Sequence, residues 1–471
     1  MEPVITPAQM AQIDLLAQNF GAATETLMQN AGYAIAAAIR LRFPPCRVLV
    51  LAGPGNNGGD GYVSARALKN WGWPVAVAAI APPRPGSDAA VAASRWHGPL
   101  AKPEPKRVRR ADLVIDAVFG AGLSRDISPE LAELLSEAPC LLAVDIPSGI
   151  DGTTGAVRGF APQADVTVTF GALKPGHLLY PGREYCGETV CADIGIPSAA
   201  IAKIAIKTWR NTPALWHLPP RQSTDHKYKR GALTICIGAM AGAALLAAEA
   251  ARRVGAGLVA VAGPPPAIGA PAGILFFSQG TRELLEDNRR QTWLCGPGLG
   301  IDQAAVELAQ LLAAKRTVIA DADALTACAD APERLRGVAV ITPHIGEFAR
   351  IFPALTGDKL AAARTAAVAI GSIVVLKGAD TIIAAPDGRA AINDNAPSTL
   401  ATAGTGDVLA GIIAGLIAQN MTPFDAACAG VWLHGATATV APQNLIAEDL
   451  APLLQRVMAD PARFDLKISR R

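Results

Sequence analysis

The sequence predicts two α/β domains, each built on a mostly parallel sheet. Near-continuous apolar runs recur along both halves of the chain, and such runs are typical of strands that helices cover on both faces. Between the halves lies "KTWRNTPALWHLPPRQSTDHKYKRG" (207–231), a polar, proline-bearing stretch that indicates a linker. At 471 residues the chain is also long for one domain. We expect an N-terminal domain at 1–205, a linker at 206–224 and a C-terminal domain at 225–471.

The predicted strands follow one another at regular intervals. In the first half they are "RVLVLAG", "PVAVAAI", "ADLVIDAVFG", "PCLLAVDIP" and "ADVTVTFG". In the second half they are "GALTICIGA", "LVAVAG", "TWLCGPGLG", "TVIADADAL", "VAVITPH" and "SIVVLKGADTIIAAPDG". Helix-like segments separate several of these strands, and two apolar helices, 407–419 and 425–440, follow the last one.

The composition excludes several classes of protein. A hydrophobic fraction of 51% and a charged fraction of 17% are typical of a compact globular chain rather than a disordered one. The formal net charge of +2 gives no electrostatic case for nucleic acid binding. Charges and prolines interrupt the most apolar region, 231–277, so we expect no membrane segment. Eight scattered cysteines and an N-terminus unlike a signal peptide predict a cytoplasmic protein.

The loop "GPGNNGGDG" (53–61) lies between a predicted strand and a predicted helix. Its backbone amides would face outward at the N-terminus of that helix, where an anion is stabilised. The loop is not a Walker motif, because Gly61 and Tyr62 stand where lysine and serine would be. A plain tight turn is the alternative interpretation.

Polar residues follow two further strands of the first half. Asp116 stands near the end of one strand, and Asp145 and Ser148 follow the next. Because the carboxyl ends of parallel strands meet at one edge of a sheet, these residues should converge there. The oxygens of Asn57, Asp116 and Ser148 suit an alkali or alkaline-earth cation rather than zinc. For each of the three, capping a helix or turn is the alternative role.

Five motifs of the first half, "LMQNAG", "GPGNNGGDG", "DAVFGAGLSR", "DIPSGID" and "GALKPGH", resemble the YjeF N-terminal domain, the NAD(P)H-hydrate epimerase. The resemblance covers about residues 5–200. It implies a Rossmann-like three-layer domain that interconverts the R and S forms of hydrated NADH or NADPH, with K⁺ held by Asn57, Asp116 and Ser148. The implied substrate contacts are Asn56, Asn57, Gly58, Gly59, Asp60, Gly120, Ala121, Gly122, Leu123, Ser124, Arg125, Asp126 and Asp145.

Epimerisation at C6 of a hydrated nicotinamide needs a general acid or base near the ring and groups that tolerate a transient iminium cation. Asp145 is the first candidate for this role and Lys174 is the second. Which of the two is the acid or base stays open at this point. Asp60 is expected to serve the structure of the loop and substrate contact.

The segment "TLATAGTGDVLAGIIAGLIAQ" (399–419) carries the strongest signal of the second half. Gly404, Gly406 and Asp407 stand where an apolar helix begins, so backbone amides there can stabilise charge on a transferring phosphoryl group. Asp407 is placed to take a proton from an attacking hydroxyl. An Asp cap on a glycine turn is the alternative. Lys377 at a strand end is typical of a phosphate-binding lysine, and His344 follows another strand.

With "DHKYKRG" (225–231), these motifs resemble the YjeF C-terminal domain, a ribokinase-like NAD(P)H-hydrate dehydratase, over roughly 215–460. In that family a nucleotide phosphorylates the hydroxyl of the hydrate, and loss of phosphate restores the dihydronicotinamide. The resemblance implies Asp407 as the base. It also implies nucleotide contacts at Lys377, Gly378, Ala379, Asp380, Thr381, Gly404 and Gly406, and S-hydrate contacts at Ala256, Gly298, Gly300, His344 and Asp407.

The two resemblances together imply a bifunctional repair enzyme, because hydration gives both epimers and a stereospecific dehydratase clears only one. By analogy with the fused bacterial form we expect ADP as co-substrate, with ATP left open, Mg²⁺ with the nucleotide, and a homo-oligomer. The alternative is a small-molecule kinase of the hydroxymethylpyrimidine kinase type, with a non-catalytic N-terminal binding or oligomerisation domain.

Overall fold

The computed structural model describes residues 1–266, 271–465 and 469–470. The backbone divides into two compact units, which we call the N-unit and the C-unit. The N-unit consists of residues 3–206 with the strand at 469–470, and the C-unit consists of residues 1–2 and 207–465. Each unit is an α/β sandwich, so the prediction of two α/β domains is confirmed.

The N-unit is built on a seven-stranded sheet in the order β18-β7-β6-β5-β4-β2-β3, and all of its strand pairs are parallel. Its strands are β2 (Val48–Ala52), β3 (Val75–Ala79), β4 (Leu113–Ala117), β5 (Leu141–Val144), β6 (Val166–Phe170), β7 (Glu188–Ala192) and β18 (Ser469–Arg470). Its helices are α1 (Pro7–Asn19), α2 (Thr24–Arg42), α3 (Asn56–Asn70), α4 (Asp88–Ser94), α5 (Pro105–Arg110), α6 (Pro129–Ser136), η1 (Pro175–His177), α7 (Gly182–Tyr185) and α8 (Ser198–Ile201).

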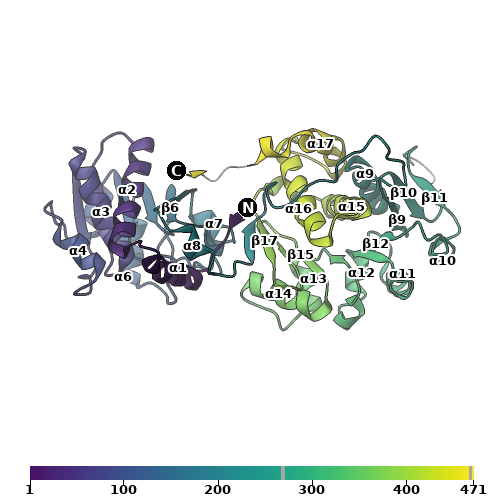
Figure 1. The fold of residues 1–471 in the computed structure, drawn as a ribbon, viewed down its shortest axis with the longest axis horizontal. Coiled ribbons are helices and arrows are strands. Elements are labelled where there is room, and N and C mark those ends of the chain that lie inside the picture. The colour runs from purple at the N-terminus through teal and green to yellow at the C-terminus, as the bar shows by residue number, and fades with distance from the viewer. Residues whose placement is uncertain (267–270, 466–468, 471) are drawn as a thin grey trace. The chain divides into compact units, whose positions relative to one another are not determined.

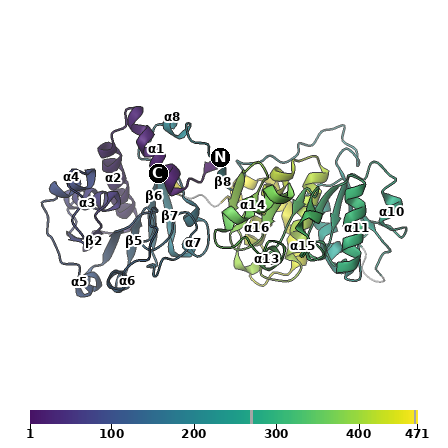
Figure 2. The ribbon, with the colours of Figure 1, turned by 90° about the horizontal axis from the view of Figure 1, so that it is seen from below.

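Alternation along the strands of the N-unit produces two cores. Val48 and Val50 of β2 pack with α2 and α3, whereas Leu49 and Leu51 pack with α5 and α6. Because successive side chains point to opposite faces, a strand that is apolar at every position requires helices on both sides. Figure 2 shows these two helix layers on either side of the sheet.

The C-unit carries an eleven-stranded sheet in the order β1-β8-β17-β16-β15-β14-β13-β12-β9-β10-β11. Its strands are β1 (Glu2–Pro3), β8 (Thr208–Arg210), β9 (Ala232–Cys236), β10 (Leu258–Ala262), β11 (Leu275–Phe277), β12 (Thr292–Cys295), β13 (Thr317–Ala320), β14 (Val340–Ile341), β15 (Ile373–Leu376), β16 (Thr381–Ala384) and β17 (Ala390–Asn393). The neighbouring strands β15, β14, β13, β12, β9, β10 and β11 run parallel to one another, and β16 is antiparallel to both of its neighbours.

The helices of the C-unit form two layers as well. They are α9 (Ala241–Arg253), α10 (Thr281–Leu284), α11 (Ile301–Ala313), α12 (Asp323–Thr326), η2 (Pro332–Leu335), α13 (Ile345–Ile351), α14 (Lys359–Ile370), η3 (Ser398–Leu400), α15 (Thr405–Ala418), α16 (Pro423–Thr439), α17 (Ala447–Ala459) and η4 (Pro461–Phe464). In Figure 1, α9 and α15 to α17 lie on one side of the sheet and α11 to α14 on the other. The helix α15 is buried at most positions, so its apolar sequence after Asp407 reflects a helix inside the core.

Two details differ from the expectation. The stretch expected as a linker begins with a strand, β8, which pairs with β17 in the C-unit sheet. Arg210 on β8 is 1% exposed and forms ion pairs with Asp394 (2.8 Å) and Glu2 (3.2 Å). The run "SIVVLKGADTIIAAPDG" is not one strand but two, because the chain reverses direction after Lys377.

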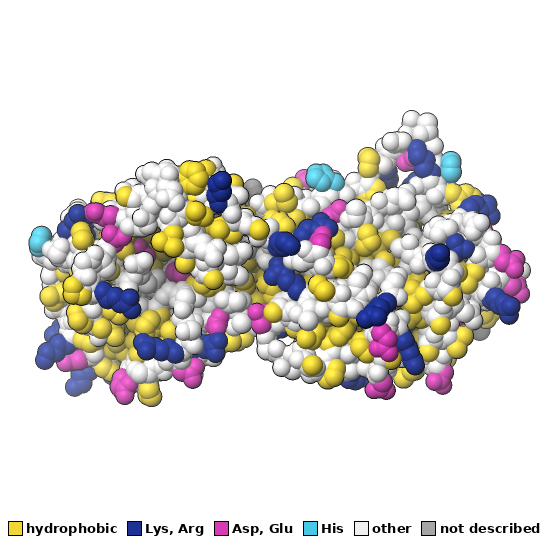
Figure 3. Space-filling model, turned by 60° about the horizontal axis from the view of Figure 1, so that its bottom comes forward, with side chains coloured by type: hydrophobic (Ala, Val, Ile, Leu, Met, Phe, Trp, Pro, Cys, Tyr) yellow, Lys and Arg dark blue, Asp and Glu magenta, His cyan; other side chains and the backbone are white. Residues whose placement is uncertain are grey.

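The surface agrees with the small net charge. On the face drawn in Figure 3, basic and acidic side chains are interspersed. Among the described helices, none combines the length and the apolar character that a bilayer crossing requires.

Candidate active sites

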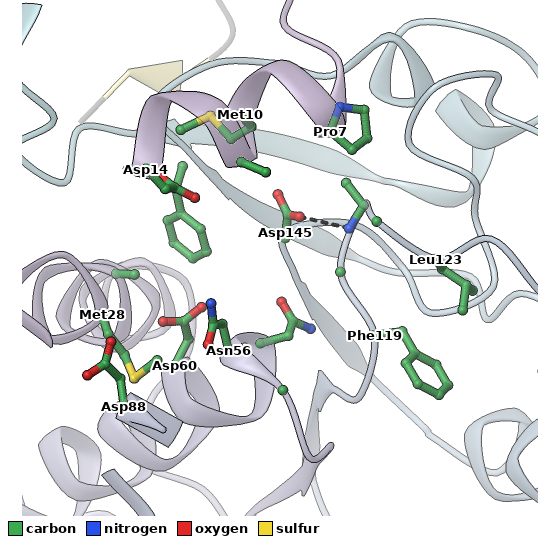
Figure 4. A pocket seen from close by; sticks show the side chains of 18 of the residues that line it. Pro7, Met10, Asp14, Met28, Asn56, Asp60, Asp88, Phe119, Leu123 and Asp145 are labelled. Carbon is green, nitrogen blue, oxygen red and sulfur yellow. Dashed lines mark hydrogen bonds between the residues drawn. The ribbon is translucent and has the colours of Figure 1, made fainter. Parts of the chain in front are cut away.

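The N-unit contains a cavity of about 950 Å³ at the carboxyl edge of its sheet. Its wall is formed by α1, the start of α2, the start of α3 and the loops that follow β4, β5 and β6. A cavity at this edge is where open parallel sheets bind their ligands. Figure 4 shows Asp14, Asp60 and Asp145 reaching this space from three different elements.

Most residues expected at the first site do line this cavity. They are Asn56, Asn57, Asp60, Gly120, Ala121, Gly122, Leu123, Ser124, Arg125, Asp145 and Lys174. Three others, Gly58, Gly59 and Asp126, are not among its described lining residues. Gly58 has a packing role instead: a Cβ atom there would lie 1.9 Å from the carbonyl oxygen of Gly53, so only glycine lets the loop close.

Asp145 and Lys174 form an ion pair inside the cavity. Lys174 Nζ donates to Asp145 Oδ1 at 2.8 Å and to Thr169 Oγ1 at 2.8 Å. Thr169 Oγ1 donates to the same Asp145 oxygen at 2.9 Å, and the Ala121 amide donates to Oδ2 at 2.8 Å. Although burial opposes ionisation, the Lys174 charge and these hydrogen bonds hold the pKa of Asp145 below its usual range.

His177 fixes the backbone beneath this pair. Its Nδ1 accepts from the Lys174 amide at 2.9 Å, and its Nε2 lies 2.7 Å from the Asp145 carbonyl oxygen. Burial, and then the Lys174 charge, lowers the pKa of His177 to about 4. A neutral ring with its proton on Nε2 satisfies both contacts. Asp145 has a φ of 66°, a left-handed conformation that this bond helps to hold.

Asp60 and Asp14 differ sharply from Asp145. Burial, and then the charges of Asp145 and Asp14, raises the pKa of Asp60 well above its usual range. Burial also raises the pKa of Asp14, with Lys174 opposing and Asp145 adding to the shift. Among the described residues, no hydrogen bond or ion pair reaches either carboxyl group. Both carboxyls therefore favour the protonated form more than a surface aspartate does.

Asp14, Thr169 and His177 were missed by the sequence reasoning. For Asp14 a signal existed: Pro7, Met10, Ala11 and Asp14 share the spacing of one helix face, and all four line the cavity.

The residues expected to hold a cation come together in part. Asp116 is fully buried and accepts from the Ser148 amide (2.8 Å) and from Ser148 Oγ (2.7 Å). Ser148 Oγ in turn accepts from the Phe119 amide at 2.9 Å. Asn57 Oδ1 would lie 3.2 Å from a Cβ atom at Gly120, the next residue of that loop. Burial raises the pKa of Asp116 to about 6.

The second site lies at the carboxyl edge of the C-unit sheet. Lys377, after β15, donates to Asp321 Oδ1, after β13, at 2.9 Å. Although burial opposes it, the Asp321 charge raises the pKa of Lys377 above its usual value. The ammonium also faces the start of α15, since a Cβ atom at Gly406 would lie 3.4 Å from Lys377 Nζ. The charge of a lysine and the amides of a helix N-terminus thus meet at one point.

Asp407 stands in the first turn of α15, after a cap at Gly404 with a φ of 88°. Burial, and then the charge of Asp321, raises the pKa of Asp407 to about 6, against the opposing effect of Lys377. A carboxylate with such a pKa is ionised at neutral pH but remains a competent base. Asp321 was not singled out from the sequence, although it directly follows β13, as Asp145 directly follows β5.

His344 caps α13. Its Nδ1 accepts from the Gly346 amide at 3.0 Å and the Glu347 amide at 3.2 Å, and Glu347 Oε2 accepts from the His344 amide at 2.8 Å. A backbone bridge joins His344 to Lys377, and the side chain of His344 is 54% exposed. His344 Nε2 lies 3.6 Å from Glu347 Oε1, and the exposed part of the ring stands at this edge, where a ligand can reach it.

The glycine loops of the C-unit bring backbone groups to the same edge. Gly298 and Gly300 follow β12, and the Gly300 amide donates to Asp323 Oδ2 at 2.8 Å. After Lys377, the turn from Gly378 to Thr381 is closed by Thr381 Oγ1, which donates to the Gly378 carbonyl at 2.9 Å. In this turn Ala379 precedes Asp380, which is buried and paired with Lys359.

Ala256 does not join this group. It precedes β10, whereas Gly298, His344 and Lys377 follow strands that run parallel to β10. Ala256 therefore lies at the opposite edge of the sheet, where it lines a separate cavity of about 460 Å³ with Arg230, Arg252 and Arg253. The expected contact between Ala256 and the ligand bound at Asp407 does not fit this topology.

Comparison with known proteins gives two family matches. Residues 24–176 match the family described as YjeF-related protein N-terminus, and residues 233–459 match the family described as NAD(P)H-hydrate dehydratase. Curated relatives named bifunctional NAD(P)H-hydrate repair enzyme Nnr are similar along almost their whole length. That of Thermofilum pendens is 35% identical over 93% of this chain and 92% of its own, and that of Escherichia coli is 36% identical over 92% and 89%. That of Thermosynechococcus vestitus is 34% identical over 97% and 98%.

Proposed function

The chain belongs to the family of bifunctional NAD(P)H-hydrate repair enzymes, and from that premise we propose how its two sites divide the repair. The N-unit cavity interconverts the R and S hydrates. The C-unit edge then dehydrates the S form with a nucleotide as phosphoryl donor. The observation that carries the proposal is that one chain places an acidic cavity in the N-unit and a lysine–helix N-terminus site beside Asp407 in the C-unit.

The dehydratase half needs a phosphate cradle and a base. We propose that the first amides of α15 at Gly404 and Gly406, with Lys377, bind the transferring phosphate of ADP, and that the turn from Gly378 to Thr381 contacts the nucleotide. Asp407 takes the proton of the C6 hydroxyl as its oxygen attacks phosphorus. Phosphate then leaves C6, a proton leaves C5, and the dihydronicotinamide is restored with AMP and phosphate as the other products.

The hydrate itself would lie against His344 and the loop of Gly298 and Gly300, because these groups share the edge with Asp407. A nucleotide brings Mg²⁺, which prefers carboxylate oxygens, and Asp321 and Asp323 follow β13 at the same edge. ADP rather than ATP as the donor rests on the resemblance to the fused bacterial form.

The epimerase half has a donor set that fits a potassium ion. Asp116 is a fully buried carboxyl group, and no ion pair reaches it from the described residues. Asn57 Oδ1, the atom that could bind a cation, lies beside the loop after β4, 3.2 Å from where a Cβ atom of Gly120 would be. We propose that Asn57, Asp116 and Ser148 hold K⁺, which supplies the positive charge that the buried carboxylate lacks. The remaining cavity residues, Asn56, Asp60 and those from Gly120 to Arg125, would contact the hydrated dinucleotide.

Two further proposals are a cytoplasmic location, which fits cysteines that form no disulfide, and assembly as a homo-oligomer, which rests on the family resemblance. Fractionation of the native cells and sedimentation of the purified chain test them. A sedimentation coefficient for the monomer at micromolar concentration would contradict the second proposal.

The recovery of absorbance at 340 nm tests the main proposal. The full-length protein is incubated with mixed R and S NADH hydrate, Mg²⁺, K⁺ and either ADP or ATP. Full recovery is expected with ADP, because the R form is converted and then cleared. Recovery of the S fraction alone would refute the epimerase half. No recovery with either nucleotide would refute the dehydratase half and favour a small-molecule kinase with a non-catalytic N-terminal domain.

A further inference from the structure

We propose that Asp60 and Asp14 are the two proton-transfer groups of the epimerase, and that Asp145 and Lys174 form beside them a positioning pair whose charges stay fixed. The inference rests on the proposed function and assigns residues within it. It changes the expectation from the sequence, in which Asp145 or Lys174 was the acid or base.

The hydrogen bonds of Asp145 and Lys174 argue against proton transfer by either group. Asp145 Oδ1 accepts from Lys174 and Thr169, and Oδ2 accepts from the Ala121 amide, all within 2.9 Å. Lys174 Nζ in turn uses all three of its donors, on Asp145, Thr169 and the Phe170 carbonyl (3.3 Å). A carboxylate held ionised by three donors is a weak base, and an ammonium with no spare N–H cannot protonate a substrate.

Asp60 has the opposite character. It is 9% exposed, lines the cavity from α3, and its carboxyl group has no hydrogen bond or ion pair among the described residues. The charges that act on it most, those of Asp145 and Asp14, are both negative. A buried, unpartnered carboxyl facing a ligand cavity retains its proton and is able to donate it to the ligand.

Asp14 supplies the second group. It reaches the same cavity from α1, whereas Asp60 comes from α3 (Figure 4). Two carboxyls on separate helices can serve the two faces of a ring held between them. Epimerisation involves both faces of the ring, because the hydroxyl leaves from one face of C6 and water returns to the other.

One conversion balances with these two groups and water, and proton exchange with solvent then returns Asp60 to its protonated form and Asp14 to its ionised form. The proton of Asp60 passes to the C6 hydroxyl, the C6–O bond breaks, and water leaves while the N1 lone pair forms the iminium bond. A water molecule then bonds to C6 from the other face, the π electrons return to N1, and the proton of the water passes to ionised Asp14. Conversion in the reverse direction starts from protonated Asp14. No oxidant, reductant or other co-reactant is consumed.

Fixed negative charge stabilises the intermediate. After proton transfer, Asp60 is ionised and offsets the iminium cation, and the carboxylate of Asp145 remains in place throughout. The titratable or charged side chains that line this cavity, among the described residues, are Asp14, Asp60, Arg84, Asp88, Arg125, Asp145 and Lys174. Asp116 lies at the end of β4, and His177 contacts the Asp145 backbone.

The test measures R-to-S conversion in the full-length protein by chiral chromatography of NADH hydrate, with K⁺ and without nucleotide. We expect Asp60→Asn and Asp14→Asn each to lower kcat at least about 100-fold while KM changes less than about threefold. Asp165→Asn is the matched control, because it removes a carboxylate of the same unit that does not line the cavity. Calorimetry of each variant, with an N-unit unfolding transition at the wild-type temperature, reports that the mutated unit is folded.

The pH profile separates proton transfer from a structural role. In the wild type, kcat should fall at high pH as the protonated carboxyl is lost. Asp60→Asn should lack this limb. Asp145→Asn should keep the limb but shift it to lower pH, because it removes a charge that raises the pKa of Asp60. Asp60→Glu should recover part of kcat.

Two outcomes would overturn the inference. One is an Asp60→Asn variant that keeps more than a third of the wild-type kcat. The other is a high-pH limb that persists in Asp60→Asn and disappears in Asp145→Asn. Failure of the wild type itself to convert R to S would instead refute the proposed function.

Discussion

The N-unit and the C-unit build their sites from the same parts and use them differently. Each has a lysine paired with an aspartate at strand ends, Lys174 with Asp145 at 2.8 Å and Lys377 with Asp321 at 2.9 Å. Each also has a second aspartate near the start of a glycine-led helix, Asp60 on α3 and Asp407 on α15, whose pKa is raised.

The difference lies in what the lysine faces. The side chain of Lys174 is 3% exposed and its donors are all used by protein groups, whereas that of Lys377 is 19% exposed and faces the amides at Gly406. A lysine whose N–H groups are all bonded to the protein only keeps its partner ionised. A lysine with an N–H group left for a ligand, beside a helix N-terminus, is suited to bind a phosphate. We propose that in both units the ion pair sets the electrostatic field and the aspartate near the helix start transfers the proton.

Removing the Asp407 carboxyl from the C-unit should have the largest effect. We expect Asp407→Asn to lower kcat for S-hydrate dehydration about 10³-fold, or about 4 kcal/mol, because the attacking hydroxyl loses its base. The wild-type rate should fall as pH drops through about 6, where Asp407 becomes protonated. Steady-state rates at 340 nm between pH 5 and 8 measure both effects. R-to-S conversion by the variant serves as the control, and dehydration within tenfold of wild type would contradict the assignment.

Replacing the lysine of each ion pair tests how much each lysine contributes to the stability of its unit. Lys377→Met leaves Asp321, 2% exposed, without its partner and should destabilise the C-unit by about 3–4 kcal/mol. Lys174→Met should cost the N-unit less, about 2 kcal/mol, because Thr169 and the Ala121 amide still bond Asp145. Calorimetry of the two unfolding transitions measures the two costs.

The double change Lys377→Met with Asp321→Leu is the matched control for that experiment. It removes both charges and should regain most of the stability lost by Lys377→Met alone. Equal losses in the two units would show that the hydrogen bonds to Asp145 do not compensate for a missing lysine.

Potassium should stabilise the N-unit and leave the C-unit unchanged. At about 100 times its Kd, an ion that binds only the folded state adds about 2.7 kcal/mol, or about 5–10 °C in Tm for a domain of this size. The folded pKa of Asp116, about 6, exceeds its usual 3.8, so without the ion stability declines as pH rises through this window. The K⁺ effect should therefore be larger at pH 8 than at pH 5.

Thermal scans in KCl against tetramethylammonium chloride measure this effect at matched ionic strength. Asp116→Asn should abolish its pH dependence. A gain from K⁺ that is equal at pH 5 and pH 8 would argue against Asp116 as a ligand.

The smallest effect is expected at His344. His344→Ala should destabilise the C-unit by about 1 kcal/mol, because the two amides at the start of α13 lose their cap. His344→Asn should restore the cap and hence the stability, while KM for the S hydrate stays raised in both variants. Urea unfolding measures the change in stability, and initial rates measure KM for the S hydrate. A KM that recovers with the cap would limit His344 to a structural role.

Much of this organisation could be predicted from the sequence, because local patterns determine it. Buried strands that end in Asp116 or Asp145, and a glycine-led helix that carries Asp407, place polar groups at a sheet edge whatever the rest of the chain does. What could not be predicted depends on three-dimensional contacts. Only the fold shows that Lys174 forms its ion pair with Asp145, and that no described residue bonds the Asp60 carboxyl. Ala256 was grouped with the wrong edge on the family resemblance, although it precedes the predicted strand "LVAVAG" and the carboxyl-edge rule already placed it at the opposite end.

The short strand β8 was likewise missed, because three residues within a polar stretch carry no periodic signal. It is held by its partner β17 and by the ion pairs of Arg210, which join residues more than 180 positions apart.

The exchange of terminal strands has a consequence for separating the two activities. The first strand of the chain, β1, extends the C-unit sheet, and the last, β18, extends the N-unit sheet. A gene cut between Ile206 and Lys207 would give two polypeptides that each lack an edge strand, and Arg210 would lose Glu2. Clean halves would require a circular rearrangement in which each piece carries its own terminal strand. In this chain the two repair steps are thus linked by topology as well as by a peptide bond.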